Sequence, residues 1–422
     1  MRNILRINDT IANQLAYYLL LVFLVTLPYD RLYSELALIC FALHTLIHLT
    51  RDQLRAFSFK RILLPISIYL LTCIGTLYTN YPVQAFGEWE RQLAILLFPL
   101  LLSLSSLDLY KYRLRLLDGL GLSCVITILY LYGHAIHVIR YNHLPLSELF
   151  STAFINHNFS EPIDMHATYF SLYIALSVSV FFYQLLQPGT KPGKVLYASG
   201  LLVLVAGLIQ LSSRAVLIAL LVNCVVVLPY CLATGIKRIA FMLTACGISV
   251  LLVLLLIRSD AFRNRYTTEL KNDLTQASIN LNILEPRVVR WSCAWELIKE
   301  SPIIGHGSGS EIPLLKEKYF ERRYFNSYVN ELNAHNQFLS CWIKTGLPGL
   351  LVFLLVLIVG FADAFRYRDM VYAGFMVIIT VVCFSENLLD GNKGIFFFAF
   401  GYAMFYLVRR KINLPADQIT QK

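Results

Sequence analysis

The chain has 422 residues, of which 57% are hydrophobic and 15% are charged, and its formal net charge is +10. Apolar runs of about 16–22 residues recur from end to end, and roughly 20 residues of helix cross the hydrocarbon layer of a bilayer. Runs of this length exclude a membrane β-barrel, whose strands are shorter and alternate between apolar and polar residues. We therefore expect an all-α, polytopic membrane protein.

Twelve apolar runs are predicted to span the membrane as helices. They cover residues 14–28, 35–50, 62–78, 92–106, 116–137, 165–186, 195–211, 214–230, 239–257, 337–361, 370–385 and 393–408. Lysine and arginine gather in the loops on one side of this topology and near both termini, which predicts that this side is cytoplasmic. The net charge therefore indicates topology and not nucleic-acid binding. We expect one transmembrane domain over 1–422, with both termini in the cytoplasm and no cleaved signal peptide.

The sixth predicted span begins on the outer side with "DMHATYFSLY". His166 and Tyr169 stand at this entrance, where they could bind a sugar or a phosphate. His166 could equally cap the helix, and the pattern alone does not decide between the two roles.

Arg214 begins the eighth predicted span, in "LIQLSSRAVLIALLV". A charge at the rim of a membrane segment is costly and usually faces a cavity or a partner. The alternative is an arginine that reaches phospholipid headgroups. The outer position, where basic residues are scarce, favours a functional role.

Residues 258–336 form the largest predicted outer loop. "EPRVVRWSCAWELIKESP" predicts a helix that starts near Pro286 and stops at Ser301-Pro302, "IIGHGSGS" predicts a glycine-rich turn, and "IPLLKEKYFERRYFNSYVNEL" predicts a second helix. A long loop with helices of its own is usually functional. We expect a small helical cap on the outer face.

Arg287 and Arg290 lie in the first turn of the first cap helix. The free N–H groups of a helix N-terminus favour an anion, and an arginine there suits an incoming phosphate. Either residue could instead be an ordinary solvated charge.

His335 and Asn336 lie in "NAHNQFLSCWIKTGLPGL", where the cap returns to the membrane. A neutral imidazole there could take a proton from a hydroxyl. A structural histidine bonded to the neighbouring asparagines is the alternative. Gly346-Leu-Pro-Gly349 predicts either a bend or a close-packing point in the span that follows, which would help to set the angle of that helix.

Glu386 and Asp390, in "FSENLLDGNKG", could orient a histidine or balance an arginine. The histidine pairs elsewhere lack acids or cysteines at metal-ligand spacing, and the cysteines sit mostly inside spans, so we expect neither a metal site nor a disulfide. Walker, GxSxG, HExxH and Asp-x-Asp motifs are absent from the sequence. The polar residues collect on the outer face, which favours chemistry on a lipid-linked substrate at the membrane surface.

These segments resemble the O-antigen ligase and O-antigen polymerase superfamily of bacterial envelope glycosyltransferases. The resemblance rests on "SSRAVLIAL", on "RVVRWSCAWELIKESPIIGHGSG" and on "AHNQFLSCWIKTGLPGL", with "MHATYFSLY" similar to a His-Pro-Thr-Tyr element in which Ala167 replaces the proline. The motifs are individually loose, and their order around one large loop is specific.

The resemblance implies an inverting glycosyl transfer without cofactor or metal at the periplasmic face of the bacterial inner membrane. The donor would be a glycan on undecaprenyl pyrophosphate, and the acceptor a sugar hydroxyl of lipid A–core. Arg214 and Arg287 would hold the pyrophosphate, and His335 would act on the acceptor hydroxyl. His166, Tyr169, Arg290, Asn336 and Glu386 are secondary candidates.

Three alternatives stay open. An O-antigen polymerase would use the same donor to extend lipid-linked repeats, and a protein O-oligosaccharyltransferase would transfer to protein. A flippase of lipid-linked sugars would need polar residues along a central path, whereas here they lie mainly at one face.

Overall fold

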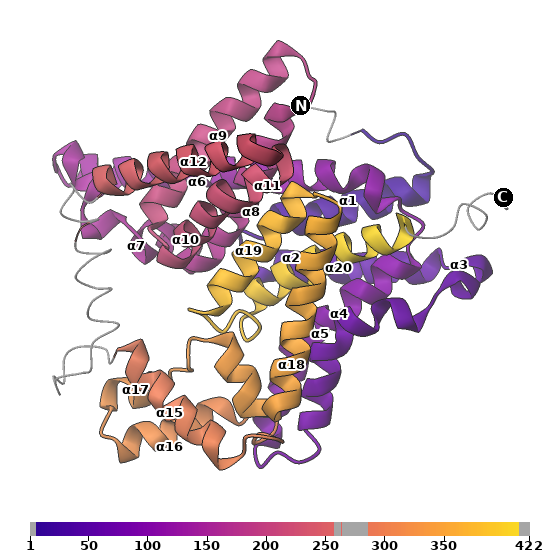
Figure 1. The fold of residues 1–422 in the computed structure, drawn as a ribbon, viewed down its shortest axis with the longest axis vertical. Helices are drawn as coiled ribbons and strands as arrows, with labels where there is room; N and C mark the ends of the chain where they lie inside the picture. Colours follow the sequence, from indigo (N-terminus) through magenta and orange to yellow (C-terminus); the bar gives the residue numbers. More distant parts are fainter. Residues whose placement is uncertain (1–5, 257–262, 264–285, 413–422) are drawn as a thin grey trace.

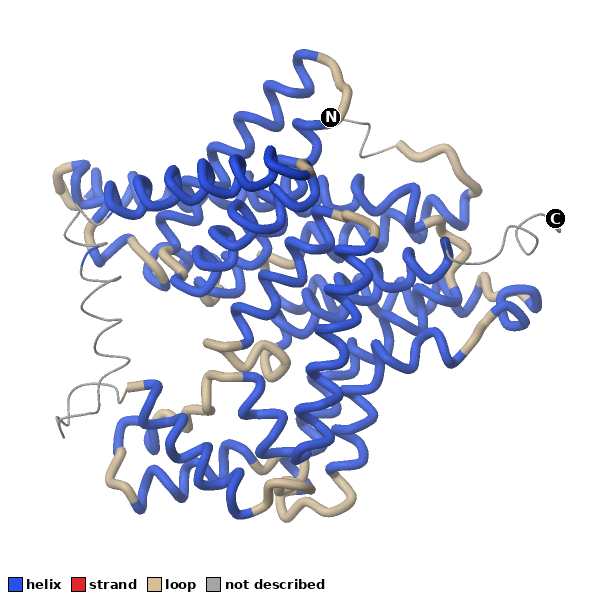
Figure 2. The backbone as a smooth tube through the Cα atoms, viewed as in Figure 1, coloured by secondary structure: helices blue, strands red, loops and turns tan. Residues whose placement is uncertain are grey.

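The structure, a computed structural model, describes residues 6–256, 263 and 286–412. Within these residues the chain forms helices and loops, and none of them lies in a strand (Figure 2). Most of the first half of the predicted outer loop, residues 258–262 and 264–285, lies outside the described residues, as do both chain ends. The expected all-α class is confirmed for the described part.

Helices occupy the positions of all the predicted spans. They are α1 (Ile11–Thr26), α2 (Arg31–Ile47), α4 (Phe59–Gly75), α5 (Pro82–Leu104), α6 (Leu109–Tyr141), α8 (Ala167–Leu186), α9 (Lys191–Leu211), α10 (Arg214–Val222) with α11 (Leu228–Leu232), α12 (Gly235–Leu256), α18 (Gln337–Arg366), α19 (Met370–Cys383) and α20 (Asn392–Ile412). Among the described helices, five are long and apolar enough to cross a membrane: α6, α8, α9, α10–α11 and α18. The chain thus has the character of a membrane protein, and the count of twelve crossings stays a prediction.

Short helical segments fill the connections between these helices. They are α3 (Arg51–Ala56), η1 (Leu146–Phe150), η2 (Thr152–Phe154), α7 (His157–Ser160) and η3 (Glu161–Ile163), and a π-helical turn, η4 (Asn223–Val227), joins α10 to α11.

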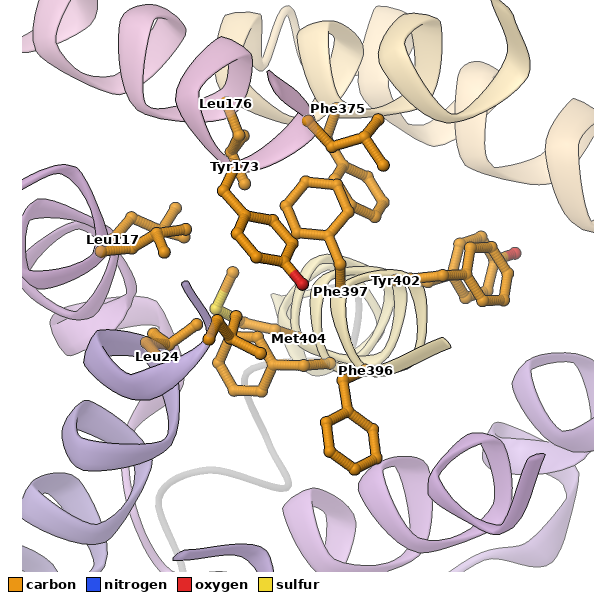
Figure 3. Packing of buried hydrophobic residues seen from close by; sticks show 14 of the residues in the cluster. Leu24, Leu117, Tyr173, Leu176, Phe375, Phe396, Phe397, Tyr402 and Met404 are labelled. Carbon is orange, nitrogen blue, oxygen red and sulfur yellow. The ribbon is translucent and has the colours of Figure 1, made fainter. Parts of the chain in front are cut away.

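Helix α20 lies at the centre of the apolar core. Figure 3 shows it surrounded by side chains of α1, α6, α8 and α19, with Phe397 beside Tyr173 and Phe375. A helix that is apolar on every side is expected to be buried on every side, and residues 395–406 are buried throughout. This explains why a helix with a short apolar stretch can be buried on every side along its middle.

The peripheral helices instead expose apolar side chains. On α2 and α12 these include Leu32, Leu36, Ile39, Leu43, Ile47, Ile236, Ile239, Leu243 and Ile248. Apolar faces of this extent on a water-exposed surface would promote association, whereas lipid covers them without cost. The placement of apolar residues therefore supports a bilayer environment.

Three helices form the cap, at the lower end of Figure 1: α15 (Arg287–Glu300), α16 (Glu311–Glu321) and α17 (Phe325–Val329). The predicted first cap helix is confirmed. The prediction of one continuous second helix is wrong, because the chain turns between α16 and α17. Arg323 has φ 59°, Tyr324 N–H donates to the Tyr319 carbonyl at 2.8 Å and Arg323 N–H to Phe320 at 3.1 Å. This is a Schellman helix end with arginine in the position that glycine usually takes, so the sequence carried no stop signal.

The predicted bend at Gly346 is confirmed, and the structure shows its purpose. Gly346 has φ 65° and ψ −159°, which interrupts α18 and leaves carbonyls of its first part unpaired within the helix. The glycine-rich turn of the cap donates to them, from His306 N–H to Ile343 and from Gly307 N–H to Lys344, both at 2.8 Å. A Cβ on Gly346 would lie 2.2 Å from the Ile303 carbonyl oxygen. The break therefore fastens the cap to α18.

Candidate active site

His335, Glu386 and Arg287 meet where the cap, the start of α18 and the α19–α20 connection come together. The Nδ1 of His335 lies 3.1 Å from Glu386 Oε2, and Arg287 Nη2 lies 3.5 Å from Glu386 Oε1. His335 and Arg287 are half-buried, and Glu386 is buried. Two predicted site residues are thus brought together by a third that was only a secondary candidate.

Glu386 is held in its ionised form. Burial alone would raise its pKa, but the hydrogen bond from His335 and the charges of His335 and Arg287 outweigh burial, so its pKa is lowered. A carboxylate only accepts hydrogen bonds, so the proton of a neutral His335 ring must be on Nδ1. The lone pair of Nε2 is then available to take a proton from a substrate.

The backbone of His335 adopts a left-handed conformation with φ 47°. Such a conformation costs a non-glycine residue roughly 1–3 kcal/mol and persists where the surroundings impose it. Here the N–H of His335 donates to Asn333 Oδ1 at 2.9 Å, and the N–H of Asn336 donates to Asn387 Oδ1 at 2.8 Å. The side chain of Asn336 caps α18 through the N–H groups of Phe338 and Leu339. Asn336 is thus placed as a structural cap beside His335.

Glu311, the first residue of α16, ties the two segments that carry His335 and Glu386. Its Oε1 accepts from Ala334 N–H at 3.0 Å and from Asn387 Nδ2 at 2.8 Å, and its Oε2 accepts from Ser340. One buried carboxylate therefore contacts the residue before His335 and the residue after Glu386. Sequence reasoning missed Glu311, because nothing in the pattern of a charged cap helix marks one acid as buried.

Lys344 lies one step deeper and is surrounded by acids. Its Nζ is 2.8 Å from Glu88 Oε1, 2.8 Å from Asp390 Oδ1 and 3.4 Å from Glu311 Oε2. These residues come from α18, α5, the α19–α20 connection and the cap, so a single ion cluster joins four parts of the chain. Sequence analysis named Asp390 but missed Glu88 and Lys344. Lys344 carried the signal of a charge within an apolar stretch, whereas Glu88 lies in the polar segment before a predicted span and carried none.

His166 caps α8 and also lies close to the His335 cluster. Its Nδ1 accepts from Thr168 N–H at 3.3 Å, and its ring centroid lies 4.2 Å from that of His157 and 5.4 Å from that of Tyr169. Burial of the ring is the largest influence and lowers its pKa to about 4, with Glu386 opposing and His157, His335 and Arg287 assisting. The structural and the functional interpretation of His166 are therefore compatible. Its neighbour His157 was missed by sequence analysis.

The two remaining arginines differ in position. Arg290 is 3% exposed, on the face of α15 that packs inside the cap, whereas Arg287 reaches Glu386. Arg214 begins α10 directly after a tight turn in which Ser212 has φ 48°. The contacts described above do not include Arg214, so its part in the site stays a prediction.

Across the described residues, no group of three or more His, Cys, Asp or Glu side chains is arranged to hold a metal ion.

Comparison with known proteins points to one family. Residues 199–354 match the family model of O-antigen ligase, a range that contains Arg214, Arg287, His335 and Gly346. A protein of Haemophilus influenzae (strain ATCC 51907 / DSM 11121 / KW20 / Rd), described as an uncharacterized protein, is 32% identical over 75 residues. That alignment covers 18% of this chain and 19% of the length of the relative, so it carries no statement about activity. The resemblance expected from the sequence is confirmed by the family match, because residues 199–354 match the O-antigen ligase family model and so support the O-antigen ligase superfamily.

Proposed function

We propose that the protein is an O-antigen ligase of the bacterial inner membrane. It transfers a glycan from undecaprenyl pyrophosphate to a sugar hydroxyl of lipid A–core at the periplasmic face, with inversion at the anomeric carbon. The arrangement of His335, Glu386 and Arg287 carries this proposal, because it joins a base, an acid that orients it and a cation for a leaving group within 3.5 Å contacts.

His335 acts as the base. Its Nε2 removes the proton of the acceptor hydroxyl as the hydroxyl oxygen attacks the anomeric carbon of the donor sugar. Glu386 accepts a hydrogen bond from the Nδ1–H of the ring and stabilises the imidazolium that forms. This division of work requires a fixed ring, which the cap on α18 and the hydrogen bonds to Asn333 and Asn387 supply.

Arg287 receives the leaving group. The bond between the anomeric carbon and the pyrophosphate oxygen breaks as the new glycosidic bond forms, and both electrons stay on the pyrophosphate. A guanidinium has five N–H donors, so Arg287 can bind a phosphate while it keeps its contact with Glu386. Arg214 is proposed as the second cation at the pyrophosphate, and together the two arginines offset charge that develops in the transition state.

The first experiment tests the chemistry. Purified full-length protein is supplied with lipid-linked glycan and lipid A–core from a strain that lacks the gene, and transfer is measured. His335→Ala should lower the rate by about 10²–10⁴-fold, the usual contribution of a general base. His134→Ala, which changes an exposed histidine on α6, is the matched control and should transfer normally. Wild-type rates in His335→Ala protein would refute the catalytic assignment.

A deletion strain separates the alternatives. A ligase deletion should leave polymerised glycan on its lipid carrier and lipopolysaccharide without a glycan cap. Lipopolysaccharide capped with a single repeat would indicate a polymerase instead. Glycan retained on the cytoplasmic face would indicate a flippase.

A further inference from the structure

Two cavities lie near the α19–α20 connection, which carries Glu386. The larger has a volume of about 700 Å³ and lies between the start of α5, α16 and the α19–α20 connection. The smaller has a volume of about 470 Å³ and is lined by the α1–α2 connection, the segment before α8 and the start of α20. Each lies within the range of about 300–1,000 Å³ that is usual for small-molecule sites. Arg91, Tyr169, Asp390 and Gly391 line both, so the two cavities form one double recess.

The double recess begins directly beside the proposed base. Asn333, which lines the larger cavity, accepts the N–H of His335, and Asn387, which also lines it, follows Glu386 in the chain. His335, Glu386 and Arg287 themselves line neither cavity. The recess therefore meets the segments that carry His335 and Glu386 through Asn333 and Asn387.

The lining suits sugars and not lipid chains. Acidic, basic and amide side chains line the larger cavity, including Glu88, Arg91, Asn333, Asn387 and Asp390. The smaller cavity has three acids and three cations on its walls: Asp30, Asp164, Asp390, Arg31, Arg91 and Lys393. An isoprenoid or acyl chain would remove exposed charges such as Asp30, Asp164 and Arg91 from water, whereas the hydroxyls of a saccharide can bind acids, amides and guanidinium groups alike.

Arg91 is the cation of the recess that lacks a protein partner. Lys344 contacts three acids, Lys316 lies 2.5 Å from Glu331, and Lys393 donates to the carbonyls of Leu27 and Tyr29. Arg31 lies 3.9 Å from Glu35. Among the described residues, no hydrogen bond or ion pair involves the exposed side chain of Arg91.

We propose that the double recess binds the sugar chain of the acceptor and that Arg91, at the wall between its two cavities, is a specificity-determining residue for that saccharide. This inference rests on the proposed function, because it assigns the acceptor of that transfer to the recess. The acceptor hydroxyl enters from the larger cavity, and the sugars that precede it extend past Arg91 and Tyr169 into the smaller one.

The test compares KM values for acceptor and donor in purified full-length protein. Arg91→Ala should raise the KM for lipid A–core about tenfold, because a charged hydrogen-bond donor to the ligand is lost, and should leave kcat and the KM for lipid-linked glycan within twofold. Val83→Trp places a large ring at an exposed position of the larger cavity and should also raise the acceptor KM. Arg140→Ala, an exposed arginine of α6 that lines neither cavity, is the matched control.

The outcomes separate this inference from the proposed function. If wild-type protein transfers glycan and both variants keep the acceptor KM of the wild type, the recess is not the acceptor site. If the donor KM rises instead, the recess binds the donor glycan and the inference is overturned. Absence of transfer by the wild type would refute the proposed function itself, and the KM comparison would not be reached.

Discussion

Two neighbouring groups of buried charges differ in how completely they are paired. Lys344 is enclosed by Glu88, Asp390 and Glu311, and its side chain is 9% exposed. Glu386 is buried, but its partners His335 and Arg287 have side chains that are 24% and 26% exposed. In the first group, the charges are paired with one another inside the protein. The second keeps donor and acceptor atoms available to a ligand.

The comparison indicates separate tasks for the two groups. The Lys344 cluster fixes the relative position of the cap, α5, α18 and the α19–α20 connection, and Glu311 passes that position on to the segments of His335 and Glu386. The Glu386 group then performs the proposed chemistry in a prearranged geometry. A buried charge is thus a guide to function only when its partners can still reach a substrate.

Loss of Lys344 should have the largest effect on stability. Lys344→Met leaves three acids close together without their cation, and breaking a buried ion pair from one side typically costs about 3–5 kcal/mol. We expect a large drop in the thermal midpoint or a failure to accumulate, measured on detergent-solubilised protein. Lys316→Met is the control, because it breaks an exposed pair with Glu331 and should cost about 1 kcal/mol or less. Equal loss in the two variants would remove the distinction between the clusters.

Loss of the Glu386 charge should instead act on the rate. Glu386→Gln keeps an oxygen for the His335 ring but no longer stabilises its protonated form, so kcat should fall about 10–100-fold, as for other residues that orient a functional histidine. The thermal midpoint should change little, and the KM for lipid A–core should stay near that of the wild type. Glu90→Gln, at an exposed position of α5, provides the control. A Glu386→Gln protein that lost stability with unaltered kcat would assign Glu386 to the structural group.

The sequence predicted the helices well, because apolar runs and helix stop signals are local properties. The twelve predicted segments, the first cap helix and the bend at Gly346 all correspond to observed elements. The break between α16 and α17 was missed, since Arg323 takes a left-handed conformation that the sequence does not mark. The local sequence pattern predicts where helices lie. It fails where a residue adopts backbone angles that are uncommon for its type.

The site was predicted in part for a related reason. His335, Arg287 and Glu386 were recognised as polar residues at the rims of apolar segments, and the structure brings them together. Glu311 and Lys344 were missed because their importance comes from contacts between distant parts of the chain. Glu311 contacts Ala334 over 23 positions and Asn387 over 76, and Lys344 contacts Glu88 on α5. Such long-range pairs form only in the tertiary fold, and the spacing of motifs along the chain does not predict them.

The smallest expected effect concerns His166, which caps α8 and also lies close to the Glu386 group. Its pKa in the folded protein is lowered to about 4 from 6.5, so the unfolded chain takes up a proton first as the pH falls. The contribution of His166 to stability should therefore be complete above pH 6.5 and decline between 6.5 and about 4. Part of the residue is exposed, and solvent screening should limit the change to about 1 kcal/mol.

Thermal midpoints measured at pH 7.5 and pH 5 would reveal this loss. His166→Asn keeps a residue that caps helices well, so it should retain the structure of α8 and remove the decline between these two conditions. Glu386 does not interfere in that window. Its pKa is lowered below 4.5, so its stabilising charge is lost only at more acidic pH. An unchanged decline in His166→Asn protein would show that another group titrates there and that the His166 ring is solvated like an ordinary surface histidine.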